Sequence, residues 1–142
     1  ELPDDAQIEE AISIHGGNVE SYDFHGLEVL QSMVESRKGG ETGISSVEFL
    51  NRDALMKALQ DGRISKELVD ASMEAEITRS IKPANRISIE KVPNPHAILL
   101  RYRDGFMMSS AQCLQIVTLC HSGATLCIQT DSIRKTGPRH VK

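Results

Sequence analysis

The sequence predicts an α+β domain with an open, mainly antiparallel sheet and helices packed on one face. In much of residues 24–76, apolar side chains recur every three or four positions, which is the period of helices that cover a core. From residue 87 onward, alternating stretches are separated by turn signals, as in antiparallel strands. We expect one domain, residues 1–142, large enough to bury a sizeable apolar core.

The first half of the chain predicts a strand and a long helix. Residues 9–14, EEAISI, alternate toward their end and stop at Gly16-Gly17. Ser21 or Asp23 can cap the helix that follows, and Gly39-Gly40 can end it. Its apolar stripe consists of Phe24, Leu27, Leu30, Met33 and Val34.

The middle of the chain predicts one strand and two shorter helices. Residues 43–50 place Val47 and Phe49 on one face of a strand. Asn51 caps a helix over residues 52–60, and Ser65 starts another over residues 66–76.

The second half predicts an antiparallel meander after a connection at residues 77–86. Asp104-Gly105 is a strong signal for a two-residue hairpin turn. The expected strands are residues 87–92, 96–103, 106–119 and 124–130, followed by a polar basic tail.

Composition narrows the classes of function. Aromatic residues make up 4% of the chain and there is no tryptophan, which disfavours a base-stacking platform for nucleic acid. Residues 1–76 carry 17 acidic and 6 basic side chains, whereas residues 77–142 carry 3 and 10, as expected for an acidic helical layer against a basic sheet. A basic half facing an anion is the alternative. No apolar run is long enough for a membrane helix.

The termini and the cysteines suggest a cytoplasmic fragment of a larger protein. The acidic, polar start does not resemble a secretory signal, and neither end carries an element that would cap a domain. Three cysteines at an even spacing of seven residues indicate reduced thiols, because zinc sites use close pairs.

His25 is the first candidate for chemistry. A histidine in the first turn of a helix feels the positive end of the dipole, which favours the neutral imidazole. Glu28, three residues on, can share its face and favours the charged form. Tyr22 and Asp23 precede it, and Gly26 leaves room for an approaching group. The alternative is a packed histidine with a purely structural role.

Residues 37–43, RKGGETG, are the second candidate, because their glycines could expose backbone amides to an anion. The stretch follows a helix and lacks the order of a phosphate loop, so a helix C-cap is the alternative. The remaining histidines have no metal-ligand spacing. The chain also lacks a serine-nucleophile elbow and a dinucleotide fingerprint.

Residues 24–49, FHGLEVLQSMVESRKGGETGISSVEF, resemble a segment of oxidoreductases of the glucose–fructose oxidoreductase, inositol dehydrogenase and biliverdin reductase type. In that superfamily the segment opens the long helix of the C-terminal domain. His25 matches the family histidine, and Glu28 stands where its aspartate follows. Residues 96–110, HAILLRYRDGFMMSS, resemble a strand–turn–strand of the same family. The aspartate usual four residues before the histidine is replaced by Ser21.

The resemblance implies the C-terminal substrate and oligomerisation domain of an NAD(P)-dependent oxidoreductase, acting on a small polyol, sugar or carbonyl compound. His25 would carry the proton, Glu28 and Asp23 would tune it, and Tyr22 would line the substrate pocket. NAD or NADP would be held by a Rossmann domain outside this chain, so the chain alone should neither bind it tightly nor turn over. A homo-oligomer through the sheet face is also implied.

Two further hypotheses stay open. The first is a non-catalytic α+β domain that uses its sheet to dimerise or to bind a partner, because open apolar sheet faces are rarely left in water. The second is binding of an anion or nucleic acid through the basic half, for which the sparse aromatic residues offer little support. We expect neither nucleic acid nor a membrane as a partner.

Overall fold

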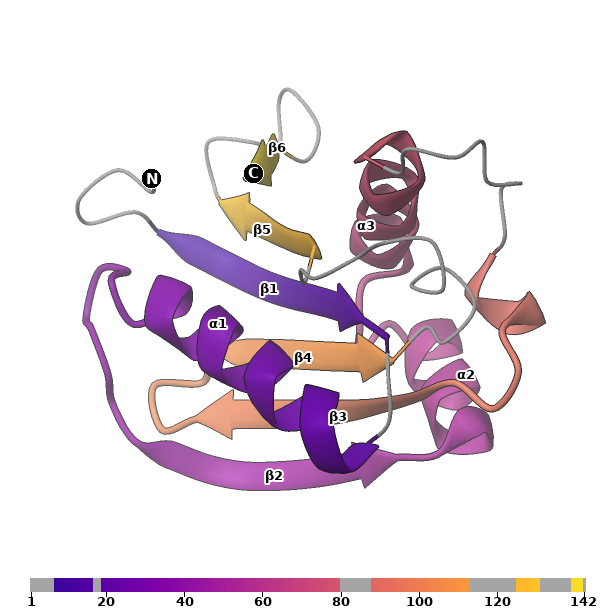
Figure 1. The fold of residues 1–142 in the computed structure, drawn as a ribbon. Helices are drawn as coiled ribbons and strands as arrows, with labels where there is room; N and C mark the ends of the chain where they lie inside the picture. The colour runs from indigo at the N-terminus through magenta and orange to yellow at the C-terminus, as the bar shows by residue number, and fades with distance from the viewer. Residues whose placement is uncertain (1–6, 17–18, 80–87, 113–124, 131–138, 142) are drawn as a thin grey trace.

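The computed structural model describes residues 7–16, 19–79, 88–112, 125–130 and 139–141, which form a six-stranded open sheet with three α-helices (Figure 1). The strand order is β2-β3-β4-β1-β5-β6. The strands are β1 (Ile8–His15), β2 (Ile44–Leu50), β3 (His96–Tyr102), β4 (Met107–Gln112), β5 (Thr125–Thr130) and β6 (Arg139–Val141). The α-helices are α1 (Phe24–Val34), α2 (Arg52–Gln60) and α3 (Lys66–Arg79), with a π-helix η1 (Val19–Asp23) and a 3-10 helix η2 (Ile89–Lys91).

The α+β class and the open, mainly antiparallel sheet are confirmed, with one parallel pair. A hairpin joins β3 to β4 at the predicted place, but its loop has three residues, 103–105, rather than two, because the Tyr102 amide donates to the Phe106 carbonyl at 2.8 Å. Gly105 ends this loop with a positive φ of 90°. Strand β1 enters beside β4 and runs parallel to it, while the other four ladders are antiparallel. The sheet is therefore mixed.

The helices lie on both faces of the sheet, which corrects the expectation that they share one face. Figure 1 shows α1 in front of β1 and β4, with α2 and α3 behind the sheet. The reason lies in β1, whose two faces are both buried: Ile12 and Ile14 face α2 and α3, whereas Ala11 lies under α1. A strand in which apolar residues alternate with small and polar ones can thus still be buried on both faces.

Two apolar cores follow from this arrangement. The larger, behind the sheet, includes Leu50, Leu55, Ile64, Leu68 and Val69. The smaller lies between the sheet and α1 and consists of Ala11, Leu30, Val34, Leu100, Tyr102, Phe106 and Met108.

The caps of α2 and α3 form as predicted. The Ala54 amide donates to Asn51 Oδ1 at 3.0 Å, and the Leu68 amide donates to Ser65 Oγ at 3.1 Å. Helix α1 differs, because Asp23 makes no side-chain cap bond. It also ends at Val34, before Gly39-Gly40, where the buried Arg37 guanidinium donates to the Val34 carbonyl at 3.1 Å.

The strand predicted at residues 87–92 is wrong for Ile89–Lys91, which form η2. Ile89 and Val92 are buried, and Arg52 donates to the carbonyls of Val92 and Glu90 at 2.7 and 2.6 Å. The Arg52 guanidinium therefore donates the hydrogen bonds that backbone amides of a neighbouring strand would otherwise donate to these carbonyls. Residues 113–119 of the predicted long strand lie outside the described residues. Of the predicted connection, residues 77–79 continue α3, and residues 80–86 also lie outside the described residues.

No helix in the described part of the chain combines the length and the apolar character that crossing a membrane requires.

Candidate functional site

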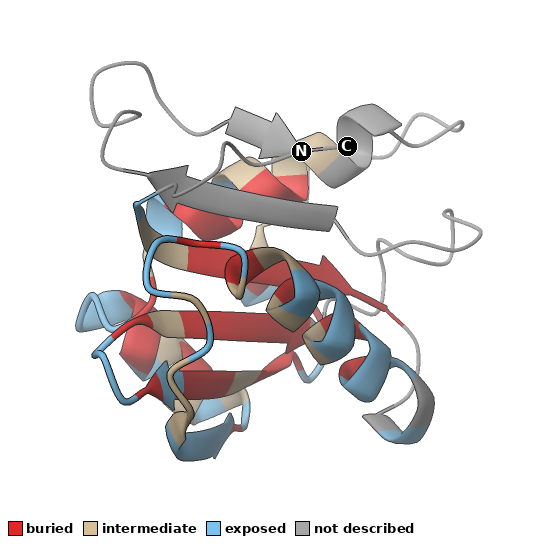
Figure 2. Ribbon diagram, turned by 90° about the vertical axis from the view of Figure 1, so that its left-hand side faces the viewer, coloured by how far each residue is buried: buried red, intermediate tan, exposed pale blue. Residues whose placement is uncertain are grey.

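The predicted site residues lie where η1 passes into α1. His25 and Glu28 come together on the outer surface of the helix, with His25 Nδ1 3.2 Å from Glu28 Oε2 and 68% of the His25 side chain exposed. Phe24 is exposed and its ring centroid lies 5.4 Å from that of His25. Tyr22 is half exposed. Figure 2 shows exposed segments recurring along α1, with intermediate and buried segments between them.

Asp23 points the other way, into the protein. Its Oδ2 lies 2.7 Å from His96 Nε2, and its Oδ1 lies 3.5 Å from His15 Nε2. All three side chains are buried. The structure therefore separates Asp23 from His25 and gives it two other histidines, and we call His15, Asp23 and His96 the histidine–aspartate cluster.

The sheet register explains why these histidines meet. His15 of β1 and His96 of β3 are both register partners of Gln112 in β4, so they stand in one row across three strands. Residues in one row of a sheet point to the same face, which here is the face under α1. The carboxylate of Asp23 reaches this row from the end of η1.

Gly26 closes the cluster from above. A Cβ built at this position would lie 2.7 Å from His15 Cδ2 and 2.9 Å from Ser110 Oγ. The glycine is buried and faces the sheet, so its bare surface admits the helix to the strands. The interpretation that Gly26 leaves room for an approaching group is thus corrected, because the room is filled by β1 and β4.

The cluster is poor in hydrogen bonds. Among the described residues, four buried polar atoms around it have no hydrogen-bond partner: Ser13 Oγ, His15 Nδ1, Asp23 Oδ1 and Ser110 Oγ. Burial lowers the pKa of His15, the Asp23 carboxylate raises it, His96 lowers it again and a weak backbone contact with Gly16 raises it, with the balance below the ordinary histidine value. His15 is therefore neutral near pH 7, and the carboxylate bonds mainly to His96.

Chemically, the cluster can hold or release a proton, but it offers no room for a substrate beneath Gly26. Within the part of the chain that the structure describes, no group of three histidine, cysteine, aspartate or glutamate side chains is arranged to hold a metal ion.

The cluster reaches the surface through Phe49. The rings of Phe49 and His96 lie 5.2 Å apart, and 58% of Phe49 is exposed. Val47, two residues earlier in β2, is 64% exposed. Both stand on the α1 side of the sheet, because their register partners are Leu100 and Ile98, but α1 packs over β1 and β4 and leaves them uncovered. We call Val47 and Phe49 the β2 apolar strip.

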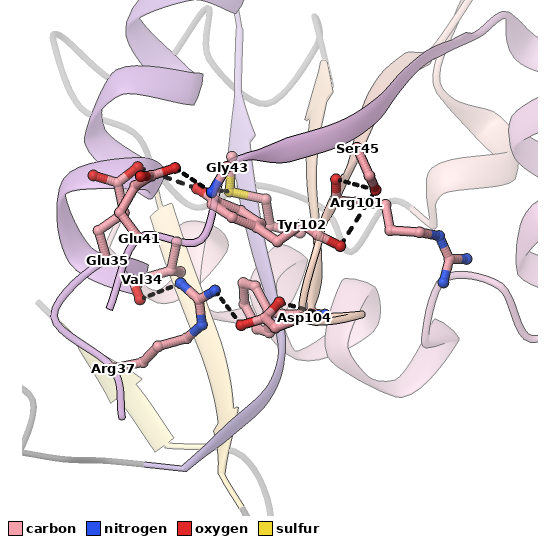
Figure 3. A network of polar contacts seen from close by, with 11 residues as sticks. Val34, Glu35, Arg37, Glu41, Gly43, Ser45, Arg101, Tyr102 and Asp104 are labelled. Carbon is pink, nitrogen blue, oxygen red and sulfur yellow. Dashed lines mark hydrogen bonds and ion pairs between the residues drawn. The ribbon is translucent and has the colours of Figure 1, made fainter. Parts of the chain in front are cut away.

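The RKGGETG stretch forms a turn in which Arg37 is fully engaged (Figure 3). Its guanidinium lies 2.8 Å from Asp104 Oδ2 and stacks on the rings of Tyr102 and Phe106 at 4.6 and 4.4 Å. Gly39 and Gly40 adopt positive φ in this turn, but the C-cap of α1 is Glu35, so the expectation that the two glycines end the helix is wrong. A cavity of about 260 Å³ beside it is lined by Gln7, Ile8, Glu9, Arg37, Lys38, Asp104 and Phe106, away from His25.

Sequence reasoning missed His15 and His96 as site residues. His15 ends an alternating strand just before Gly16, and His96 starts a strand after Pro95. A histidine at the end of a buried strand was the available signal, but 81 positions separate the two, so only the strand register joins them.

Comparison with protein-family models, curated proteins and solved structures gives no match for this chain.

Proposed function

We propose that this chain is an association domain that forms a symmetric dimer through its edge strand β2. The observation that supports this proposal is the β2 apolar strip, which exposes two large apolar side chains on an edge strand. An exposed apolar strand edge is a ready template for pairing with another chain. The proposal moves the expected oligomer contact from the sheet face, which helices cover on both sides, to the sheet edge.

Strand β2 has few of the features that usually block such pairing: its one charged side chain, Glu48, is neutralised by an ion pair with Arg63 of the same chain. Among the described residues it pairs only with β3. Its seven residues, ISSVEFL, contain neither proline nor lysine, and side chains 45–49 are all exposed. The one register irregularity lies at its start, between Ile44 and Ser46, which leaves the remainder regular. An unprotected regular edge favours antiparallel pairing with an identical strand.

Charge selects the register of the pair. With the two-fold axis at Val47, the two Val47 side chains meet, and Glu48 stands opposite Ser46 of the second copy. Ser46 is in turn the register partner of the exposed Arg101, so Glu48 and Arg101 of different copies share one row. An axis at Glu48 would place two carboxylates directly opposite each other, which is destabilising even though Arg63 of the same chain pairs with each and reduces the repulsion.

Sedimentation of the chain over a range of concentrations tests the proposal. We expect a monomer–dimer equilibrium that Val47→Lys weakens by at least about tenfold, since 1.4 kcal/mol suffices for that factor and two lysines would face each other at the axis. Val29→Lys is the matched control, because Val29 is also exposed but lies on α1. A monomer at every concentration, or equal effects of the two variants, would overturn the dimer.

The exposed His25–Glu28 pair supports a second candidate, the substrate domain of an NAD(P)-dependent oxidoreductase. An imidazole beside a carboxylate can move a proton at the surface, and Phe24 and Tyr22 next to it suit a surface that another domain covers. The described residues here do not fit a dinucleotide: His25 stands on the outer face of a helix, so the cofactor would be held elsewhere.

Fluorescence titration with NADH and NADPH of a longer chain that includes the upstream sequence tests this second candidate. Saturable binding, with turnover lost in His25→Gln but binding retained, would support it. A folded longer chain that binds neither nucleotide would refute it. For either candidate we propose a cytoplasmic setting, on the reduced state inferred for the three cysteines.

A further inference from the structure

We propose that the histidine–aspartate cluster is an acid-sensitive latch, which holds η1 and the first turn of α1 against the sheet near neutral pH and releases them on acidification. This inference does not depend on the dimer. It follows from three ionisable groups that share one closed site and that come from three separate elements, β1, η1 and β3.

The charge balance of the site makes it sensitive to protons. One carboxylate, that of Asp23, faces two imidazoles, so it can balance only one positive charge. The other elements packed against the site contribute neutral groups: Ser110 from β4, Gly26 from α1 and the Phe49 ring from β2. His25 and Glu28 point outward into solvent. A second proton therefore leaves an excess cation in a buried site, which is costly.

The direction of the His15 pKa shift decides whether acid closes or opens the latch. Because burial lowers the pKa of His15, the latched state binds a proton less readily than the released state, in which His15 has an ordinary pKa near 6.5. The latch is thus fully closed above the ordinary value and weakens as pH falls below it. The weakening is about tenfold for each pH unit until His15 is itself protonated in the latched state.

The segment that is released, residues 19–26, is bounded by the packing of the later turns of α1. Leu30 and Val34 hold the later turns of α1 in the smaller core. The five-residue π-helix η1 precedes them, and Asp23 at its end forms no cap bond but is tied to the sheet by His96 and His15. Loss of these contacts frees residues 19–26, and the opening stops where Leu30 enters the core.

Amide hydrogen exchange near pH 7.5 and near pH 5.5, corrected for the intrinsic rate, tests the latch. We expect protection of residues 19–26 to fall by up to about tenfold at the lower pH, while residues 30–34 keep theirs. In His15→Gln this pH dependence should vanish. The control His25→Gln alters an exposed histidine in the first turn of α1, and this variant should keep the pH dependence. Repeating the comparison in Val47→Lys separates release of the latch from dissociation of a dimer.

Imidazole titration by NMR provides a second readout if His15→Gln does not fold. We expect one buried histidine of the unmodified chain to titrate below the ordinary value. A titration of His15 at or above 6.5, or equal protection of residues 19–26 at both pH values, would overturn the proposal.

Discussion

Replacing Gly26 with alanine tests whether α1 is packed tightly on the histidine–aspartate cluster. In an open helix this change would stabilise the protein by about 1 kcal/mol, because glycine is a poor helix former. Here the new methyl group would meet His15 Cδ2 at 2.7 Å and Ser110 Oγ at 2.9 Å, and real Cβ atoms essentially never approach that closely. Overpacking of a core costs about 1–3 kcal/mol. We therefore expect a net loss of up to about 2 kcal/mol in the free energy of unfolding, in place of the gain expected for an open helix.

Urea denaturation near pH 7.5 measures this change, with Ser32→Ala as the control for helix propensity on the exposed side of α1. Ser110→Ala removes one of the two clashing atoms, so we expect it to recover part of the loss in the double variant. A Gly26→Ala protein that is more stable than the unmodified chain by about 1 kcal/mol, as in an open helix, would refute the close approach of α1 to β1 and β4.

Two further predictions concern other elements. Arg37→Met should lower the free energy of unfolding by about 2–3 kcal/mol, because it leaves the Val34 carbonyl and the Asp104 carboxylate without their buried cation, and urea denaturation measures the loss. Asp104 is 34% exposed, so water limits this loss, and an effect below about 0.5 kcal/mol would contradict the network. Asn51→Ala should cost about 1 kcal/mol through the lost cap of α2, whereas Asn51→Asp should keep most of it; equal melting of both variants would contradict the cap.

The sequence predicted those features that depend on neighbouring residues. Asn51 and Ser65 act through bonds within three positions, and each forms the cap that it indicates. Asp104-Gly105 marks the place of the hairpin, although the loop has three residues rather than the two predicted. Helix α1 was found from its stripe, although its start uses Asp23 differently. The Asp23 carboxylate does not form the cap bond, because it bonds instead to the buried imidazole of His96, which is distant in the sequence.

What the sequence did not predict depends on residues far apart in the chain. The parallel pairing of β1 with β4 joins residues nearly a hundred positions apart, and no local pattern records it. That pairing buries both faces of β1 and so moves α1 to the opposite side from α2 and α3. It also brings His15 into the row of His96, which is why the predicted trio of His25, Glu28 and Asp23 divides into an outer pair and an inner carboxylate.

The start of α1 therefore has two sides with different surroundings. Its outer side carries His25 and Glu28 in solvent, and its inner side rests on a buried polar cluster. Packed apolar residues in place of such a cluster would often be neutral or stabilising, so the cluster is better understood as a control of position than as a source of stability. Because the ring of His96 lies 5.2 Å from that of Phe49, we expect a change in the charge of this cluster to affect the β2 apolar strip as well. Proton binding and association would then be coupled through one ring contact, and the coupling must be reciprocal: if a partner on β2 favours the latched state, it also resists protonation of His15.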